Sequence, residues 1–242
     1  MTLDGTNTWL ISAPGATRGI VIDPGPDDES HLTAVHQAAK DRGIRVVSTL
    51  LTHGHLDHSA GARRFAELTG SEVRALDPAH RYGGEGLGDG EVIDVDGLRL
   101  DVITTPGHTT DSLSFLLPEL HALLTGDTVL GRGTAVIAHP DGRLGPYLGS
   151  LTRLRDLCGS AGVELLLPGH GPVLAEPAGV LQGYLDHRQA RLAQVEQARA
   201  AGARTAPEVV AVVYADVDPS LHWAAQLSVQ AQLDYLDGVE PG

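Results

Sequence analysis

The sequence is poor in several residue types, and each scarcity excludes a class of protein. Its 242 residues include one cysteine, one methionine, 2 Trp, 5 Tyr and 2 Phe. The lone cysteine, Cys158, excludes an intrachain disulfide. No apolar run approaches the roughly 18 residues of a membrane span, and no basic segment followed by an apolar run opens the chain. We therefore expect a cytoplasmic protein with no signal peptide and no membrane partner.

Basic residues are also scarce. The chain has 17 Lys and Arg against 31 Asp and Glu, so its net charge is -14, and Lys40 is the only lysine. So acidic a chain is not built for broad, nonspecific binding of nucleic acid, although local pairs such as Arg63-Arg64 could still steer an anion. Its length fits one large domain, or one domain with a small appendage.

A dense group of metal-binding side chains is what the sequence does contain. Four of them fall within six residues, and three more follow at wide spacing, each beside Gly or Pro. Seven nitrogen and oxygen ligands are enough to hold two divalent metal ions with positions left open for water and substrate, as in a hydrolytic site rather than a closed structural zinc site. The seven are His53, His55, Asp57, His58, His108, Asp127 and His170.

Each ligand follows a segment whose pattern indicates a strand. These segments cover residues 46–51, 98–104, 121–125 and 164–167. Asp57 and His58 follow His55 too soon for a regular helix to turn all three toward one metal, so we expect an extended loop. A helix over 60–68, capped by Ser59, should come next. Strand ends at one edge of a sheet can converge on one site.

The H-x-H-x-D-H motif at 53–58 is the signature of the metallo-β-lactamase superfamily, and the chain resembles this family over nearly its whole length. The resemblance implies an α/β (α+β) fold, the αββα sandwich, with the metals at one edge between two sheets. Family members also carry an early strand before the present start, so the resemblance implies either that this strand is missing here or that the start codon is misassigned. By the same resemblance, His53, His55 and His108 would bind the first metal, Asp57, His58 and His170 the second, and Asp127 would bridge both.

A bridging aspartate resembles the pattern in glyoxalase II and in the ribonucleases of the superfamily. The stretches at 5–10 and 131–134 and His187-Arg188-x-x-Arg191 are most similar to the branch named for β-lactamase-like protein 2. An animal member of that branch is a single-strand-specific endoribonuclease. The resemblance therefore implies hydrolysis of phosphodiester bonds in single-stranded RNA.

Helical patterns dominate the rest of the chain. Residues 28–42 and 146–161 are expected to form helices that pack on the sheets. After Pro177 come helical stretches at 180–201, from a Thr205 capping box onward, and at 219–236; together they resemble a winged-helix module without room for its wing. We divide the chain into a catalytic domain, 1–178, and this helical segment, 179–242. The segment is acidic, which favours packing, the substrate rim or a homodimer contact over nucleic-acid recognition.

The expected mechanism uses two divalent cations, zinc in the first place and manganese or iron as alternatives. Metals about 3.5–4 Å apart lower the pKa of a bridging water, whose hydroxide attacks a carbonyl carbon or a phosphorus. Asp57 and Asp127 would be catalytic by orienting that hydroxide, and Thr109, Thr110 and Asp111 are candidates for outer hydrogen bonds to the ligands. Candidate substrate contacts lie on the loop 131–149: Arg132, His139, Arg143 and Tyr147.

Other functions remain open on the sequence alone. The nearest rival is hydrolysis of a thioester, lactone or other small acyl compound. Some superfamily members bind a single iron and oxidise sulfur, although seven intact ligands favour two metals. A binding protein that uses its helical tail for DNA or a partner is a non-enzymatic alternative.

Overall fold

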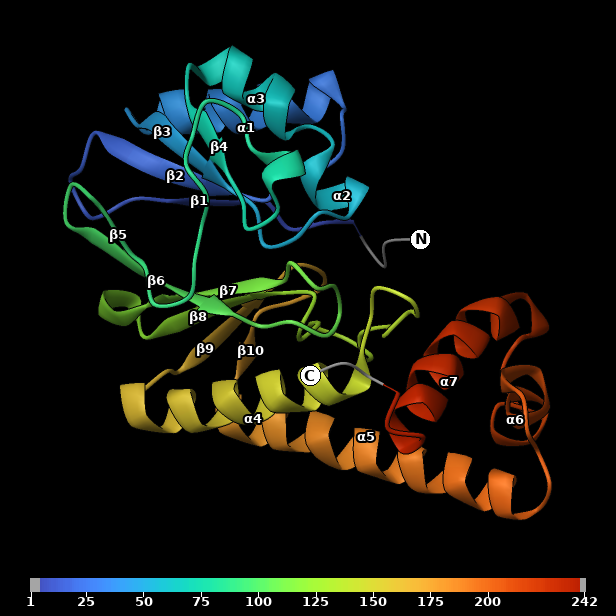
Figure 1. Cartoon of the computed structure of the whole chain (residues 1–242). Helices are drawn as coiled ribbons and strands as arrows, with labels where there is room; N and C mark the ends of the chain where they lie inside the picture. The colour runs from blue at the N-terminus through green and yellow to red at the C-terminus, as the bar shows by residue number, and fades with distance from the viewer. Residues whose placement is uncertain (1–4, 240–242) are drawn as a thin grey trace.

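The computed structural model describes residues 5–239 and has four layers (Figure 1). Two β-sheets face each other, and helices cover the outer face of each. On one side lie α1 (Glu29–Asp41) and α3 (Ala62–Thr69); on the other lie α4 (Leu144–Ala161) and α5 (Pro177–Ala200). This confirms the predicted αββα sandwich.

The first sheet has the order β1-β2-β3-β4, in which only the pair of β1 and β2 is antiparallel. The second has the order β10-β9-β8-β7-β6-β5, in which only β8 and β9 are parallel. The strands are β1 (Trp9–Ile11), β2 (Arg18–Ile22), β3 (Arg45–Leu50), β4 (Glu72–Arg74), β5 (Val92–Val95), β6 (Leu98–Thr104), β7 (Leu113–Leu117), β8 (Ala122–Gly126), β9 (Leu165–Pro168) and β10 (Leu174–Ala175).

Apolar side chains fill each interlayer space. Ile22, Leu100 and Phe115 belong to the cluster between the two sheets, and all three are fully buried. Leu151 and Leu181 belong to the cluster beneath α4 and α5. All five residues of β8 are buried, which explains why its sequence does not alternate between polar and apolar residues. The sheets are thus fixed rigidly behind the strand ends where the ligands lie.

The metal-binding loop differs from the prediction. It is not extended throughout, because a helical turn, α2 (Leu56–Ser59), follows His55. The backbone N–H groups of His58 and Ser59 both donate to the carbonyl of His55, at 2.9 Å each. Ser59 therefore ends this turn instead of capping the next helix, and its hydroxyl donates back to the carbonyl of Gly54.

The C-terminal part is helical, as predicted. It contains α6 (Ala206–Val213) and α7 (His222–Leu236), and Thr205 and Glu208 form the predicted capping box. The remaining helical turns are η1 (Pro78–His80), η2 (Pro118–Leu120) and η3 (Pro219–Leu221). No strand follows β10 up to residue 239, so the wing is absent from the described part of the chain.

Two predictions on the limits of the chain stay open. The domain boundary after residue 178 falls within the first turn of α5, which runs on from the catalytic layers into the helical tail. The early strand expected to be missing would precede Gly5, outside the described residues. Among residues 5–239, no helix is both long and apolar enough to span a bilayer.

Candidate metal centre

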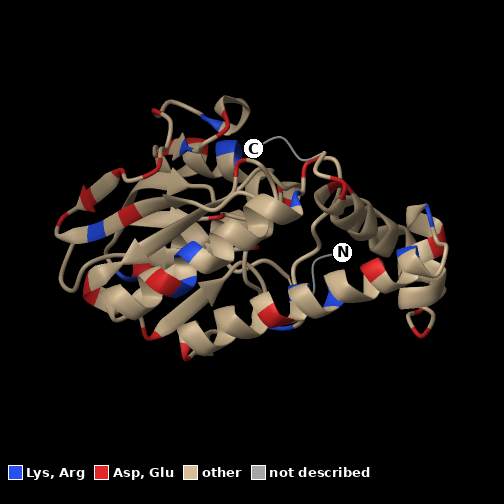
Figure 2. Ribbon diagram, turned by 60° about the horizontal axis from the view of Figure 1, so that its bottom comes forward, with Lys and Arg blue, Asp and Glu red and all other residues tan. Residues whose placement is uncertain are grey.

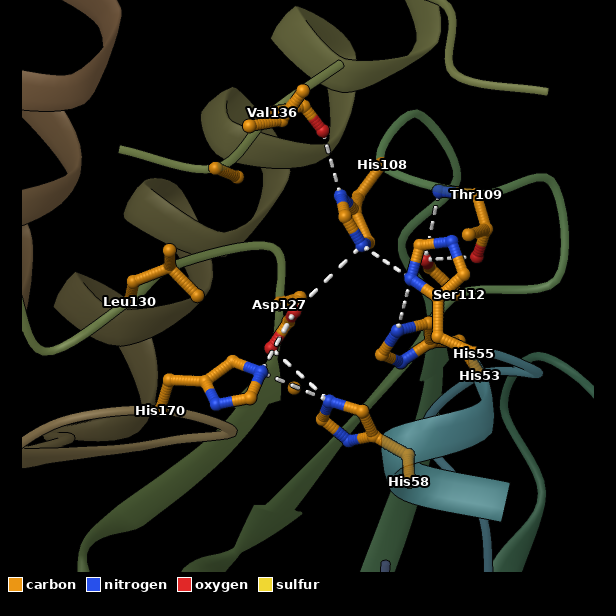
Figure 3. Close-up of polar contacts among 12 residues, drawn as sticks. His53, His55, His58, His108, Thr109, Ser112, Asp127, Leu130, Val136 and His170 are labelled. Carbon is orange, nitrogen blue, oxygen red and sulfur yellow. Dashed lines mark hydrogen bonds and ion pairs between the residues drawn. The ribbon is translucent and has the colours of Figure 1, made fainter. Parts of the chain in front are cut away.

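The structure brings all seven predicted ligands together at one edge of the two sheets. Figure 3 labels these residues except Asp57. The connection after β3 supplies His53 and His55, and the turn α2 supplies Asp57 and His58. The other three follow the ends of β6, β8 and β9: His108, Asp127 and His170. Segments far apart in the sequence therefore meet at one place because their strands end at the same edge.

The first group consists of three histidines. His55 Nδ1 lies 3.0 Å from His53 Nε2 and 3.1 Å from His108 Nε2. Ligands with bonds of about 2.0–2.1 Å to a tetrahedral zinc lie about 3.3 Å from one another, so these nitrogens have the spacing of a shared metal. His55 is exposed, whereas His53 and His108 are buried. The group is therefore open to solvent on the side of His55.

The second group is equally compact. His170 Nε2 lies 3.2 Å from Asp57 Oδ2 and 3.2 Å from His58 Nε2. Asp127 lies between the groups: its Oδ1 is 3.5 Å from His58 Nε2, and its Oδ2 is 3.3 Å from His170 Nε2 and 3.7 Å from His108 Nε2. The carboxylate of Asp127 thus faces ligand atoms of both groups, which is the place of a bridging carboxylate.

Outer hydrogen bonds fix which ring nitrogen of each histidine points inward. The Nδ1 atoms of three histidines face acceptors: His108 faces the Val136 carbonyl at 2.9 Å, and His170 faces the Gly5 carbonyl at 2.8 Å. His58 Nδ1 faces Asp23 Oδ2 at 2.8 Å. An Nδ1–H that donates outward leaves a lone pair on Nε2, which is the form that a metal needs.

Asp23 orients ligands of both groups, and the sequence analysis assigned it no role. Its carboxylate accepts hydrogen bonds from the backbone N–H of Thr52 at 2.8 Å and from the Thr52 hydroxyl at 2.6 Å. Since that hydroxyl hydrogen goes to Asp23, the Thr52 oxygen accepts from His53 Nδ1, 3.0 Å away. One buried carboxylate thus fixes His58 directly and His53 through Thr52.

A cation fits this arrangement. Once His58 and His170 have lost their extra protons, the nitrogens that point inward present lone pairs, and the carboxylates of Asp57 and Asp127 only accept, so the centre then contains acceptors without a donor between them. Asp127 Oδ1 is buried and has no hydrogen-bond partner in the described part of the chain. Two divalent ions would satisfy these atoms, and nitrogen and carboxylate ligands without thiolate suit zinc, manganese or iron.

The two groups differ in charge when no metal is bound. Burial lowers the pKa of His53 well below its ordinary value, and burial also lowers the pKa of His108. Burial acts the same way on His58 and His170, but carboxylates override it: Asp23 and Asp127 raise the pKa of His58 to about 10, and Asp127 and Asp57 raise that of His170 to about 10. The second group therefore holds protons at neutral pH.

Metal loading should consequently release protons. With pKa values of about 10 in the metal-free protein, His58 and His170 are protonated below that pH and must lose a proton to become ligands. We expect close to two protons per protein to be released when zinc binds at pH 7, and the apparent affinity to rise with pH. A pH indicator in weakly buffered solution measures this release; no release would contradict the assigned ligands.

The backbone at Gly169 packs directly against the side chains of Asp127 and His58. A Cβ at this position would lie 2.5 Å from Asp127 Oδ1 and 2.8 Å from His58 Cε1. We expect Gly169→Ala to weaken binding of one metal by at least about tenfold, because both ligands must move. The zinc content after dialysis measures the effect. Gly183→Ala is the matched control, since a Cβ at that site on α5 meets nothing within 4 Å.

The outer acceptors do not come from the predicted residues. The hydroxyl of Thr109 donates to Asp111 at 2.7 Å, and that of Thr110 donates to Asp141 at 2.8 Å, so both hydroxyls stabilise the turn after His108. The outer partners are instead Asp23, Thr52 and two backbone carbonyls. The two carbonyls cannot be recognised in the sequence. Asp23 can, because it follows β2 and lies beside Pro-Gly, as His108 and His170 lie beside Pro-Gly at the ends of their strands.

The four candidate substrate contacts lie in different settings. Tyr147 is fully buried, and its hydroxyl donates to the Thr128 carbonyl at 2.7 Å, so it packs in the core instead of facing a substrate. His139 is bound to Asp234 of α7 at 2.9 Å. Arg143 precedes α4, where its backbone N–H donates to the Gly107 carbonyl. Arg132 is exposed. Substrate contact by Arg132, His139 or Arg143 stays a prediction.

Comparisons with known proteins agree with this geometry. Residues 1–170 match the metallo-beta-lactamase superfamily, and residues 205–237 match the beta-lactamase associated winged helix domain. A beta-lactamase-like protein 2 homolog from Caenorhabditis elegans is 32% identical, over 98% of this chain and 81% of its own. An atrochrysone carboxyl ACP thioesterase from Aspergillus fumigatus is 34% identical, over 81% of this chain and 60% of its own.

The same fold occurs in a solved structure. A metallo-beta-lactamase family protein from Thermus thermophilus superposes with a TM-score of 0.76 at 23% identity, covering 98% of this chain and 94% of its own. The family match spans most of the chain and includes all seven predicted ligands. The protein therefore belongs to the metallo-β-lactamase superfamily and is a metal-dependent hydrolase of that fold.

Proposed function

We propose that the protein hydrolyses small acyl substrates, thioesters in the first place, with a binuclear metal centre. The observation that carries the hydrolytic part is the position of Asp127 between two groups of inward-facing acceptors, 3.3 Å from His170 and 3.7 Å from His108. When bound, two divalent ions lower the pKa of water toward neutrality and polarise the substrate oxygen.

The protein's own groups orient the attacking water. In the metal-free protein, burial opposes ionisation of Asp127, but the neighbouring His170 and His58 side chains hold its pKa well below its usual range, so this carboxylate stays charged. Burial also opposes ionisation of Asp57, yet His170, His58 and Thr6 lower its pKa to about 2. Both carboxylates are therefore acceptors for the protons of a water molecule at any physiological pH. The exposed side at His55 leaves room for a substrate to approach.

Surface charge favours a small substrate over a polynucleotide. At least eight arginines form ion pairs with Asp or Glu, among them Arg64 with Glu29 and Arg153 with Asp89. Figure 2 shows basic positions scattered among acidic ones rather than gathered in a stripe. With a net charge of -14, little positive potential is left to hold the phosphates of RNA. The thioesterase name of the 34% identical fungal relative supports the same choice.

Cleavage of single-stranded RNA is the second candidate. It is favoured by the resemblance to the β-lactamase-like protein 2 branch and by the winged-helix match at 205–237. A binuclear centre can attack phosphorus as well as a carbonyl carbon. The helical tail would then have to bind RNA with an acidic surface.

One experiment separates the two. Zinc-loaded protein is offered a short acyl thioester and, in parallel, an end-labelled single-stranded RNA, with Asp127→Ala as the inactive control. Thiol release is read with a thiol reagent, and the protein adds little background because Cys158 is buried and burial raises its pKa to about 11. We expect thiol release that a chelator stops, and intact RNA. Cut RNA without thiol release would replace this proposal by the ribonuclease.

A further inference from the structure

The segment between β8 and α4, residues 127–143, has neither helix nor strand, although it forms one wall of the metal centre. It begins with Asp127, and the carbonyl of Val136 accepts the hydrogen bond from His108 Nδ1 (Figure 3). A segment without a backbone ladder depends on other contacts for its position. Some of these contacts come from α5 and α7, beside which it lies in Figure 1, and others come from the backbone of Gly107 and His170.

Two side chains of these helices contact the segment on either side of Val136. The Tyr184 hydroxyl on α5 accepts from the backbone N–H of Leu130 at 2.9 Å and lies 2.9 Å from the Gly133 carbonyl. On α7, Asp234 pairs with His139 at 2.9 Å. Between these points lies the short stretch that contains Val136.

Arg188 of α5 contacts this stretch through its guanidinium group. Its side chain is buried, with 8% of the residue exposed, and its guanidinium donates to the carbonyl of Ala135 and lies 5.1 Å from the ring centroid of Tyr147. No Asp or Glu among residues 5–239 pairs with it, and its Nε has no hydrogen-bond partner there. A buried cation without a carboxylate is costly, so Arg188 is poorly explained as a device for stability alone.

We propose that Arg188 is a positioning residue for the metal ligand His108. The Ala135 carbonyl and the Val136 carbonyl belong to successive planar peptide units, which are joined at the Cα of Val136. A guanidinium that holds the first unit, together with the bond from His108 to the second, therefore limits the backbone dihedrals of Val136 and the direction of its carbonyl. That carbonyl in turn orients His108 through its Nδ1–H and keeps the lone pair of Nε2 directed at the metal. The inference rests on the metal centre and is independent of the substrate class.

The proposal gives the helical tail a role in the active site. Helix α5 continues from the sandwich into the tail, and its buried Arg188 and Tyr184 both contact the segment that carries the outer partner of His108. The tail thereby supports the group of His53, His55 and His108. The other group has its outer partners elsewhere, in Gly5, Thr6 and Asp23. Loss of the contact from Arg188 of α5 should therefore weaken the binding of one metal ion and leave the binding of the other unchanged.

The test is a metal titration of Arg188→Met with a matched control on the same helix. Methionine keeps an unbranched side chain but removes the charge and the donors. Arg191→Met is the control, because Arg191 also lies over an aromatic ring, Tyr214 at 4.6 Å, but bonds to Gln194 and the Val213 carbonyl, away from the segment. Zinc affinities are measured by chelator competition, and the melting temperature of the metal-free protein is recorded for each variant.

We expect Arg188→Met to bind one of the two zinc ions about 10–100-fold more weakly and the other as in the wild type. Its metal-free melting temperature should match that of Arg191→Met. In the zinc-loaded protein, the imidazole N–H proton of His108 should exchange faster with solvent, measured by NMR. Arg188→Lys, which keeps one donor and the charge, should recover part of the lost affinity.

Two results would overturn the proposal. One is wild-type affinity for both metals in a folded Arg188→Met protein. The other is an equal loss of affinity for both metal ions together with a lowered melting temperature. That result would show that Arg188 stabilises the fold and does not position His108. Should the methionine variant not fold, Arg188→Lys is titrated in its place: weaker binding confined to one metal supports the positioning role, and unchanged binding refutes it.

Discussion

Replacement of Asp127 by alanine is expected to lower kcat/KM by roughly 10³-fold or more, because a bridging ligand serves both metals and several kcal/mol of transition-state stabilisation depend on them. The Asp127 carboxylate faces ligand atoms of both groups, His108 on one side and His58 and His170 on the other. Its buried Oδ1 has no hydrogen-bond partner among residues 5–239, so a metal is the group that best explains its orientation.

Asp127→Asn sharpens this test. The amide has the same shape but no charge, so packing is kept and the attraction for cations is lost. Both variants should hold less than two zinc ions per protein after dialysis, measured by elemental analysis, and should fold as the wild type does. A fully loaded Asp127→Asn enzyme with near wild-type kcat/KM would contradict the bridging role.

Asp23→Asn should have the second largest effect. It should weaken the binding of both metal ions, by about 10–100-fold each. Asparagine tolerates the positive φ of 50° at this position, so the backbone strain is unchanged. Its amide can still accept from Thr52 through oxygen, but its NH₂ then faces His58 Nδ1, where an acceptor is required. His58 loses the partner that fixes its tautomer, and the hydroxyl that orients His53 is disturbed.

Chelator competition measures the zinc affinities of this variant, and thermal unfolding of the metal-free protein measures its stability. Asp23 is 1% exposed, so loss of its network should also lower the free energy of unfolding, by about 1–3 kcal/mol. Exposed Asp28, which caps α1, provides a comparison: Asp28→Asn should leave both zinc affinities unchanged. A loss confined to one metal in Asp23→Asn would show that the path through Thr52 to His53 is unimportant.

The sandwich was accessible through the family resemblance that the motif at 53–58 carries, and the convergence of seven side chains was accessible from local signals. Strand patterns end at Gly or Pro beside each ligand, and strands that end at one edge bring such positions together. Segment 98–104 is observed as β6 with the predicted limits, and the helix predicted at 28–42 is α1 at Glu29–Asp41. These elements have strong periodicity and clear stop signals.

The outer contacts were not accessible, for physical reasons. The carbonyls of Val136 and Gly5 are backbone groups that any residue supplies, so their role depends on tertiary placement alone. Asp23 is one of 31 acidic residues, and only its strand-end setting distinguishes it. The turn α2 was missed because His55 starts it without a capping side chain. Tyr147 was misplaced because a tyrosine on a loop-to-helix junction gives no sign that its ring enters the core.

Anomalous diffraction at the zinc edge, from crystals of the zinc-loaded protein, tests the central claim most directly. The account predicts two zinc peaks about 3.5–4 Å apart, one at ligand distance from His53, His55 and His108, with Asp127 contacting both. The second peak should lie at ligand distance from Asp57, His58 and His170. One peak alone, or zinc that leaves Asp127 uncoordinated, would contradict a binuclear hydrolytic centre.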